Sequence, residues 1–93
     1  MSLNLELSRE EFIEQYDIED GTVILEPFDD FKYAIVGITF DREHIMYDYS
    51  KLIDVVKGEN DMSDEEAMEY VEYNIVGLGF SSHEPIICFT EEY

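Results

Sequence analysis

The chain has 93 residues, enough for one small domain, and carries 24 Asp and Glu against 5 Lys and Arg, a net charge of −19. This charge repels nucleic acid and anionic membranes, which excludes direct binding to either and makes basic protein surfaces the favoured partners. Because 45% of the residues are hydrophobic and 14% are aromatic, the composition is that of a folded chain and not of a disordered one.

The first predicted element is a short helix that begins with a capping box. Ser8 is expected as the N-cap, and Glu11 would reach back to the Ser8 amide. The apolar residues of this helix follow at helical spacing: Phe12, Ile13, Tyr16. Asp20-Gly21 then marks a turn, and a brief strand is expected over Thr22–Leu25.

A hairpin is the next predicted element, after a break in regular structure at Pro27–Asp30. Apolar and polar residues alternate along Tyr33–Phe40, which predicts a strand. One face of that strand would hold Ala34, Val36, Ile38 and Phe40. Asp41–Glu43 supplies a tight polar turn, and His44–Tyr47 would return as the antiparallel partner.

Two helices and a strand are predicted after the hairpin. A helix is expected over about Ser50–Lys57, ended by Gly58. A second capping box, Ser63 with Glu66, opens another helix, which Gly77 and Gly79 would end. Its inner stripe would hold Ala67, Val71, Ile75 and Leu78, with Met68 beside them.

The last predicted element is a strand over about Pro85–Thr90, whose consecutive apolar residues favour burial on both faces. The expected order is α-β-β-β-α-α-β, an α+β fold with helices packed on an antiparallel sheet. The whole chain 1–93 is expected to form a single domain. Its core would occupy 28–90, and 1–27 would add the first helix and a short strand.

The helix after Ser63 places Glu65, Glu69 and Glu72 on one outward stripe without a lysine. Each like-charge pair at this spacing costs the helix about 0.2–0.5 kcal/mol. A plain solvated face and a binding surface for a basic partner are both compatible with this pattern. Asn74 falls near the inner face, where its amide would need a hydrogen-bond partner.

Residue patterns for catalysis, metals and cofactors are weak, and we predict that the protein is not an enzyme. No nucleophile motif surrounds His44 or His83, and Cys88 lies in an apolar strand. Asp17–Gly21 and Glu59–Ser63 lack the spacing of an EF-hand loop, so no metal or cofactor is expected. A single cysteine, no secretory signal and no membrane-length apolar run together predict a cytoplasmic protein.

The chain resembles a group of small acidic proteins encoded by bacteriophages and prophages. The likeness covers about Phe28 to Phe89 and includes the hairpin. Its other segments are Tyr47-Asp48-Tyr49-Ser50-Lys51, Met62-Ser63-Asp64-Glu65-Glu66-Ala67, Glu72-Tyr73-Asn74 and Pro85-Ile86-Ile87. No activity is assigned to that group, so the resemblance transfers no catalytic residue. It implies a phage or prophage context, in which small acidic proteins often inhibit host enzymes by filling a DNA-binding cleft with carboxylates.

Our leading hypothesis is a non-enzymatic binding protein whose acidic surface contacts a basic partner, in its sharpest form a DNA-mimicking inhibitor of a nucleic-acid enzyme. The residues expected to bind that partner are Glu65, Glu69 and Glu72, helped by Asp48 and Asp61, with Tyr70 and Tyr73 at the border. The alternative is a small structural or adaptor protein, with a homodimer as one form of it, whose acidity serves solubility and whose contact is apolar. A metal- or ligand-binding enzyme is the third hypothesis.

Overall fold

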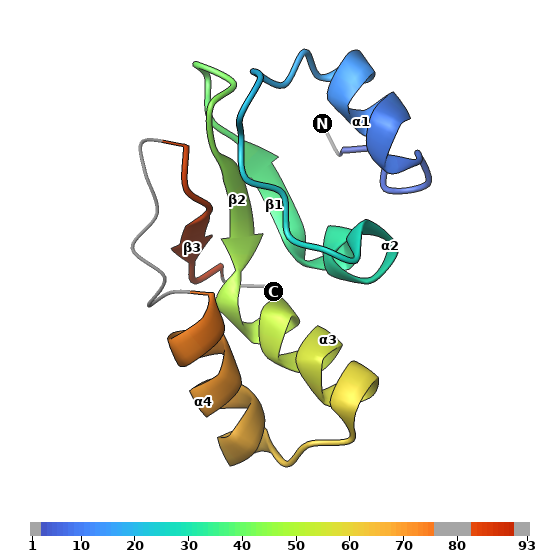
Figure 1. Cartoon of the computed structure of the whole chain (residues 1–93). Helices are drawn as coiled ribbons and strands as arrows, with labels where there is room; N and C mark the ends of the chain where they lie inside the picture. Colours follow the sequence, from blue (N-terminus) through green and yellow to red (C-terminus); the bar gives the residue numbers. More distant parts are fainter. Residues whose placement is uncertain (1–2, 76–82, 91–93) are drawn as a thin grey trace.

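The computed structural model describes residues 3–75 and 83–90 and shows an α+β fold, as predicted (Figure 1). Its elements in chain order are α1 Arg9–Gln15, α2 Phe28–Phe31, the 3₁₀ helix η1 Lys32–Ala34, β1 Ile35–Ile38, β2 Ile45–Asp48, α3 Tyr49–Asn60, α4 Asp64–Asn74 and β3 Ile86–Cys88. No helix in the described part of the chain is long and apolar enough to cross a membrane.

The three strands form a mixed sheet in the order β1-β2-β3. The β1–β2 hairpin is antiparallel, as predicted, but β3 pairs parallel to β2, with Met46 opposite Ile86. The prediction of a purely antiparallel sheet is therefore wrong. The reason is that α3 and α4 together form a crossover that returns the chain to the starting end of β2, which is what a parallel pair requires.

The alternation predicted for the first hairpin strand is also wrong. The strand begins only at Ile35, and its register shifts between Ile35 and Gly37, which breaks the period of two. Ile35 is buried, whereas Phe40 lies beyond the strand and is 99% exposed. The expected core face of this strand therefore does not exist as a continuous row.

The segment between α1 and β1 differs from expectation in two places. Thr22–Leu25 is not a strand, although the Val23 amide donates to the carbonyl oxygen of His83 at 3.1 Å and the Leu25 amide to the Tyr47 hydroxyl at 3.1 Å. The stretch after Pro27, predicted as a break, forms α2 instead. The partners of Thr22–Leu25 are distant in sequence, in β2 and in the segment before β3, and α2 packs against η1 and α3.

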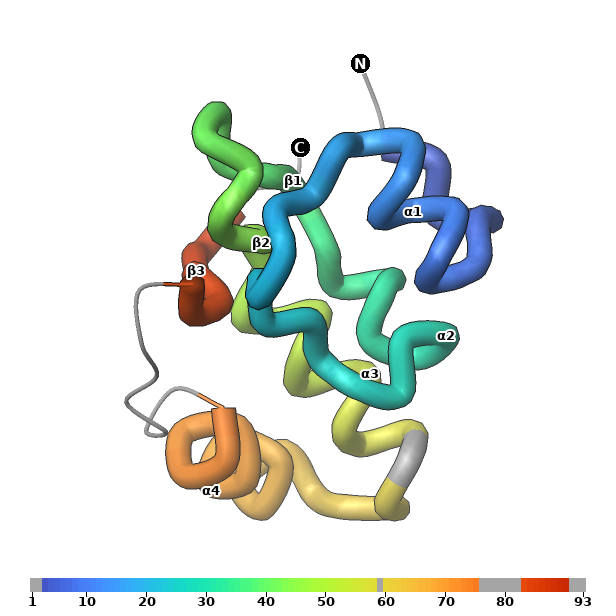
Figure 2. The backbone as a smooth tube through the Cα atoms, turned by 45° about the horizontal axis from the view of Figure 1, so that its top comes forward, coloured from blue at the N-terminus to red at the C-terminus, as the bar shows by residue number. Residues whose placement is uncertain are grey.

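One cluster of buried apolar residues joins the N-terminal segment, the sheet and the helices. Its largest fully buried side chains are Tyr47, Phe12, Ile45, Leu52, Val56 and Val71. α1 and α4 lie at opposite ends of the molecule, with the sheet and α3 between them (Figure 2). β3 is paired only with β2 in the described residues, and its three residues are partly exposed, so the prediction of a strand covered on both faces is wrong.

Gly58 does not end α3, contrary to prediction. The helix continues to Asn60, and Asp61 takes the left-handed conformation at φ 52° as its C-cap. Asp61 fills this role because a short polar side chain tolerates that conformation better than most residues.

We therefore expect Gly58→Ala to stabilise the protein by about 0.5–1 kcal/mol, because glycine inside a helix costs about that much relative to alanine. An added Cβ at this position meets no atom within 4 Å. The matched control is Gly21→Ala, which should destabilise the protein because Gly21 has a φ of +86°. Chemical denaturation of both variants measures the change in the free energy of unfolding. A loss of stability in Gly58→Ala would contradict the placement of Gly58 inside α3.

Candidate functional site

α4 is an amphipathic helix with one side on α3 and the other in solvent. Its capping box, Ser63 with Glu66, forms as predicted. Ala67, Val71 and Ile75 are buried against the core, which confirms three members of the inner stripe. Leu78, Gly77 and Gly79 lie outside the described residues, and Met68 is 44% exposed at the border of the stripe.

The outward side of α4 carries Glu65, Glu69 and Glu72 in a row, which we call the glutamate row. All three side chains are exposed, and none has a hydrogen bond or ion pair to any residue of 3–75 or 83–90. At a rise of 1.5 Å per residue the row spans about 10 Å along the helix axis. One strand of duplex DNA places about three phosphates along the same length.

Within residues 3–75 and 83–90, no basic residue forms an ion pair with the glutamate row. α4 contains five acidic residues and no basic one. Lys57 of α3 reaches only its first turn, where Nζ is 2.5 Å from Asp64 Oδ1. Arg9 pairs with Glu26 at 2.6 Å, and Lys32 lies 3.7 Å from Asp29. The negative charge of the row is therefore not neutralised by the chain's own cations.

The other acids of α4 have structural roles in its first turn. Hydrogen bonds from the Ser63 backbone and hydroxyl hold the pKa of Glu66 below its ordinary value. The hydrogen bond and charge of Asp64 raise the pKa of Lys57. Both carboxylates also face the positive end of the helix dipole. The dipole also favours Glu65, which lies in the same first turn. Folding thus accounts for Asp64, Glu65 and Glu66, whereas it does not account for Glu69 and Glu72 of the glutamate row.

Tyr70 and Tyr73 lie next to the glutamate row, as predicted. Tyr73 is 80% exposed and Tyr70 is 37% exposed. Both line an open groove on the surface of α4, together with Met62, Glu66, Glu69 and Asn74. We call this the α4 groove. The groove was not predicted from the sequence, because Met62 lies in the α3–α4 connection and only the folded chain places it beside α4.

Asn74 is not near the inner face, contrary to prediction. It is exposed, and its Nδ2 donates to the carbonyl oxygen of Tyr70 at 3.1 Å, one turn back on the same helix. This bond is local to α4 and reaches no other element. The predicted tie between α4 and a neighbouring backbone is therefore absent for this side chain.

Asp48 is not part of the acidic surface, contrary to prediction, because it is only 3% exposed. Its Oδ2 accepts the Lys51 amide at 2.9 Å as the N-cap of α3. Its Oδ1 accepts both the amide and the hydroxyl of Thr90, at 2.9 and 2.6 Å. Asp48 thus joins the start of α3 to the chain after β3. Asp61, by contrast, is exposed in the α3–α4 connection, near the N-terminal end of the glutamate row.

Tyr47 and Tyr49, on either side of Asp48, lie outside α4. Tyr47 is fully buried, and burial raises the pKa of its hydroxyl to about 12. Tyr49 is half-buried and packs on Phe89, with ring centroids 5.3 Å apart. Among the residues that the structure describes, Tyr70 and Tyr73 are the tyrosines on α4.

The two histidines, distant in sequence, come together where β2 and β3 begin. His83 Nε2 lies 3.2 Å from Glu43 Oε1, and His44 Nδ1 donates to the carbonyl oxygen of Glu84 at 2.7 Å. These contacts join the hairpin turn to the segment before β3. Cys88, on β3, donates from Sγ to the Tyr47 carbonyl oxygen at 3.5 Å. Each of the three side chains thus has a partner in the fold.

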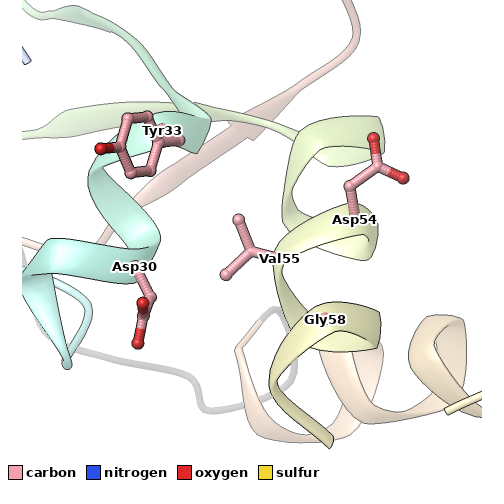
Figure 3. A pocket seen from close by; sticks show the side chains of 5 residues that line it. All are labelled: Asp30, Tyr33, Asp54, Val55 and Gly58. Atoms are coloured by element: carbon pink, nitrogen blue, oxygen red, sulfur yellow. The ribbon is translucent and has the colours of Figure 1, made fainter. Parts of the chain in front are cut away.

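A small hollow lies between α2–η1 and α3, lined by Asp30, Tyr33, Asp54, Val55 and Gly58 (Figure 3). Val55 points from α3 into the space, while the carboxylates of Asp30 and Asp54 are not turned toward one another (Figure 3). This geometry does not form an acid–base pair. Within the described residues no group of three or more His, Cys, Asp or Glu could hold a metal ion.

No protein-family model matches the chain, and neither the curated proteins nor the solved structures contain a significant match to it.

Proposed function

We propose that the protein is a non-enzymatic binding protein that uses the glutamate row and the adjacent tyrosines against a basic surface of a partner protein. The observation that supports this most is the position of the row. Three exposed glutamates share one side of a helix without any basic neighbour on that helix, at a small cost to its stability. A solvated face would gain from interspersed lysines, which α4 lacks.

The sharpest form of the proposal is a DNA mimic that inhibits a nucleic-acid enzyme in the cytoplasm. The spacing of the row resembles that of phosphates along one DNA strand, and Asp61 extends the charge beyond α4. The resemblance to acidic phage and prophage proteins supports the same class of function. A groove that binds DNA would then accept α4 in place of a short stretch of backbone.

Affinity capture tests this function. The protein is immobilised, exposed to a bacterial lysate, and eluted either with duplex DNA or with sodium chloride of equal ionic strength. We expect a nucleic-acid-binding enzyme to be retained and to be released by DNA. Two outcomes would contradict the proposal. Either duplex DNA does not release the retained partner, or the protein retains nothing beyond what a charge-matched acidic protein retains.

An adaptor that forms a homodimer is the second candidate, and the exposed apolar edge at β3 favours it. β3 has no second strand partner among the residues described here, and Phe89 beside it is 82% exposed. An unpaired strand edge can pair with a second copy. Light scattering at low and high salt separates the candidates, because this one requires an oligomer that persists in high salt.

A further inference from the structure

We infer that the α4 groove binds arginine side chains of the partner, in preference to lysine side chains. This inference deepens the proposed function and rests on it. The occupant is an arginine-rich segment of a basic protein, which the carboxylates and the aromatic rings lining the groove would bind together.

The groove pairs each aromatic ring with a carboxylate one helical turn away. Tyr73 follows Glu69 by four residues, and Tyr70 follows Glu66 by four. Side chains on a helix lean toward its N-terminus, so each ring leans toward its carboxylate. Two ring–carboxylate pairs therefore lie side by side on one surface.

An arginine side chain can use both members of such a pair at once. Its planar guanidinium stacks on an aromatic face while its N–H groups donate to a carboxylate. The ammonium of lysine is a more strongly hydrated point charge that cannot stack as a plane. Charge alone attracts both residues to α4, whereas the tyrosines favour arginine.

Other occupants fit the groove less well. Glu66 and Glu69 repel phosphates and acidic peptides, and an apolar helix would bury these two carboxylates without partners. The amide of Asn74 already donates to its own helix. A second copy of the chain would bring another strongly acidic surface against the groove.

The experiment compares nona-arginine with nona-lysine as ligands at equal ionic strength, by isothermal titration. We expect the wild-type protein to bind nona-arginine about 5–10-fold more tightly, as stacking worth about 1 kcal/mol implies. Tyr70→Ala/Tyr73→Ala, which removes both exposed rings of the groove, should bring the two affinities close to each other while leaving the affinity for nona-lysine nearly unchanged. Tyr73→Phe should retain the preference.

Phe40→Ala is the matched control, because it removes an exposed aromatic ring outside α4 and should leave the preference unchanged. Equal wild-type affinities for the two peptides, or an arginine preference that survives Tyr70→Ala/Tyr73→Ala, would overturn the inference and leave the proposed function intact. The variant Glu65→Gln/Glu69→Gln/Glu72→Gln tests the proposed function separately. If both peptides bind this variant as tightly as they bind the wild type, the proposed function fails.

Discussion

Replacing Glu65, Glu69 and Glu72 together with glutamine should weaken binding to the captured partner about 100-fold at about 0.15 M salt. Each charge that meets a basic group across an interface contributes about 1 kcal/mol or more, and the three act on the same partner surface. The dependence of the dissociation constant on salt should become shallower, because fewer ion contacts form in the complex. Titration of wild type and variant at several salt concentrations measures both effects.

Loss of binding in this variant would not be due to unfolding. The substitutions remove like-charge repulsion within α4, so the variant should be as stable as the wild type or slightly more stable. The matched control is Glu10→Gln/Glu14→Gln/Glu19→Gln, which has the same net charge and changes exposed residues at the opposite end of the molecule. Equal weakening by both variants would show that net charge, and not the glutamate row, determines binding.

Asp48→Ala should destabilise the protein by about 3 kcal/mol, which is a large share of the stability of a domain this size. The variant loses the N-cap of α3, typically worth about 1 kcal/mol, and the two hydrogen bonds from Thr90 to a carboxylate. Chemical denaturation measures this change in the free energy of unfolding. Asp54→Ala is the control, because Asp54 is an exposed acid of α3 without these bonds and its loss should change the unfolding free energy by less than about 0.5 kcal/mol.

The stabilisation by Asp48 should also depend on pH. Burial alone would raise its pKa, but the hydrogen bonds from Thr90 and Lys51 and the charge of Lys51 hold the pKa below the ordinary value of 3.8. A carboxyl group with a lowered pKa stabilises the fold above its unfolded pKa and ceases to do so as the pH falls through its folded pKa. The stability difference between wild type and Asp48→Asn should therefore shrink on acidification below about pH 4. A difference that stays constant down to pH 2 would contradict this role.

The features predicted correctly from sequence are those fixed by neighbouring residues. Ser8 and Ser63 each begin a helix because the capping box requires only a residue three positions on. The hairpin forms because its two strands are separated by a short polar turn. The glutamate row follows in the same way from helical periodicity once the start of α4 is known.

The features predicted wrongly depend on partners distant in sequence. β3 is parallel because of where the α3–α4 crossover ends, which no pattern within the strand reveals. Asp48 resembles a surface acid in the sequence, yet it is buried and accepts hydrogen bonds from Thr90, far along the chain. The predicted helix began at about Ser50. A start at Tyr49 would have made Asp48 the N-cap, a position at which Asp is favoured.

The α4 groove could not be predicted for a similar reason. Tyr70 and Tyr73 were expected near the acidic surface, but their pairing with Glu66 and Glu69 in one groove depends on Met62 and on the outward position of Asn74. Helical periodicity alone placed Asn74 near the inner stripe. In the structure Asn74 lies on the surface as the last residue of α4, and its side chain bonds back to the Tyr70 carbonyl oxygen of the same helix.

The most direct test of the central claim is a competition measurement with the captured enzyme and a labelled short DNA duplex, followed by fluorescence anisotropy. The account predicts that the wild-type protein displaces the duplex, that added salt weakens the displacement, and that Glu65→Gln/Glu69→Gln/Glu72→Gln displaces it far less well. A complex that contains the enzyme, the duplex and the wild-type protein together would contradict the claim that α4 occupies a DNA-binding groove.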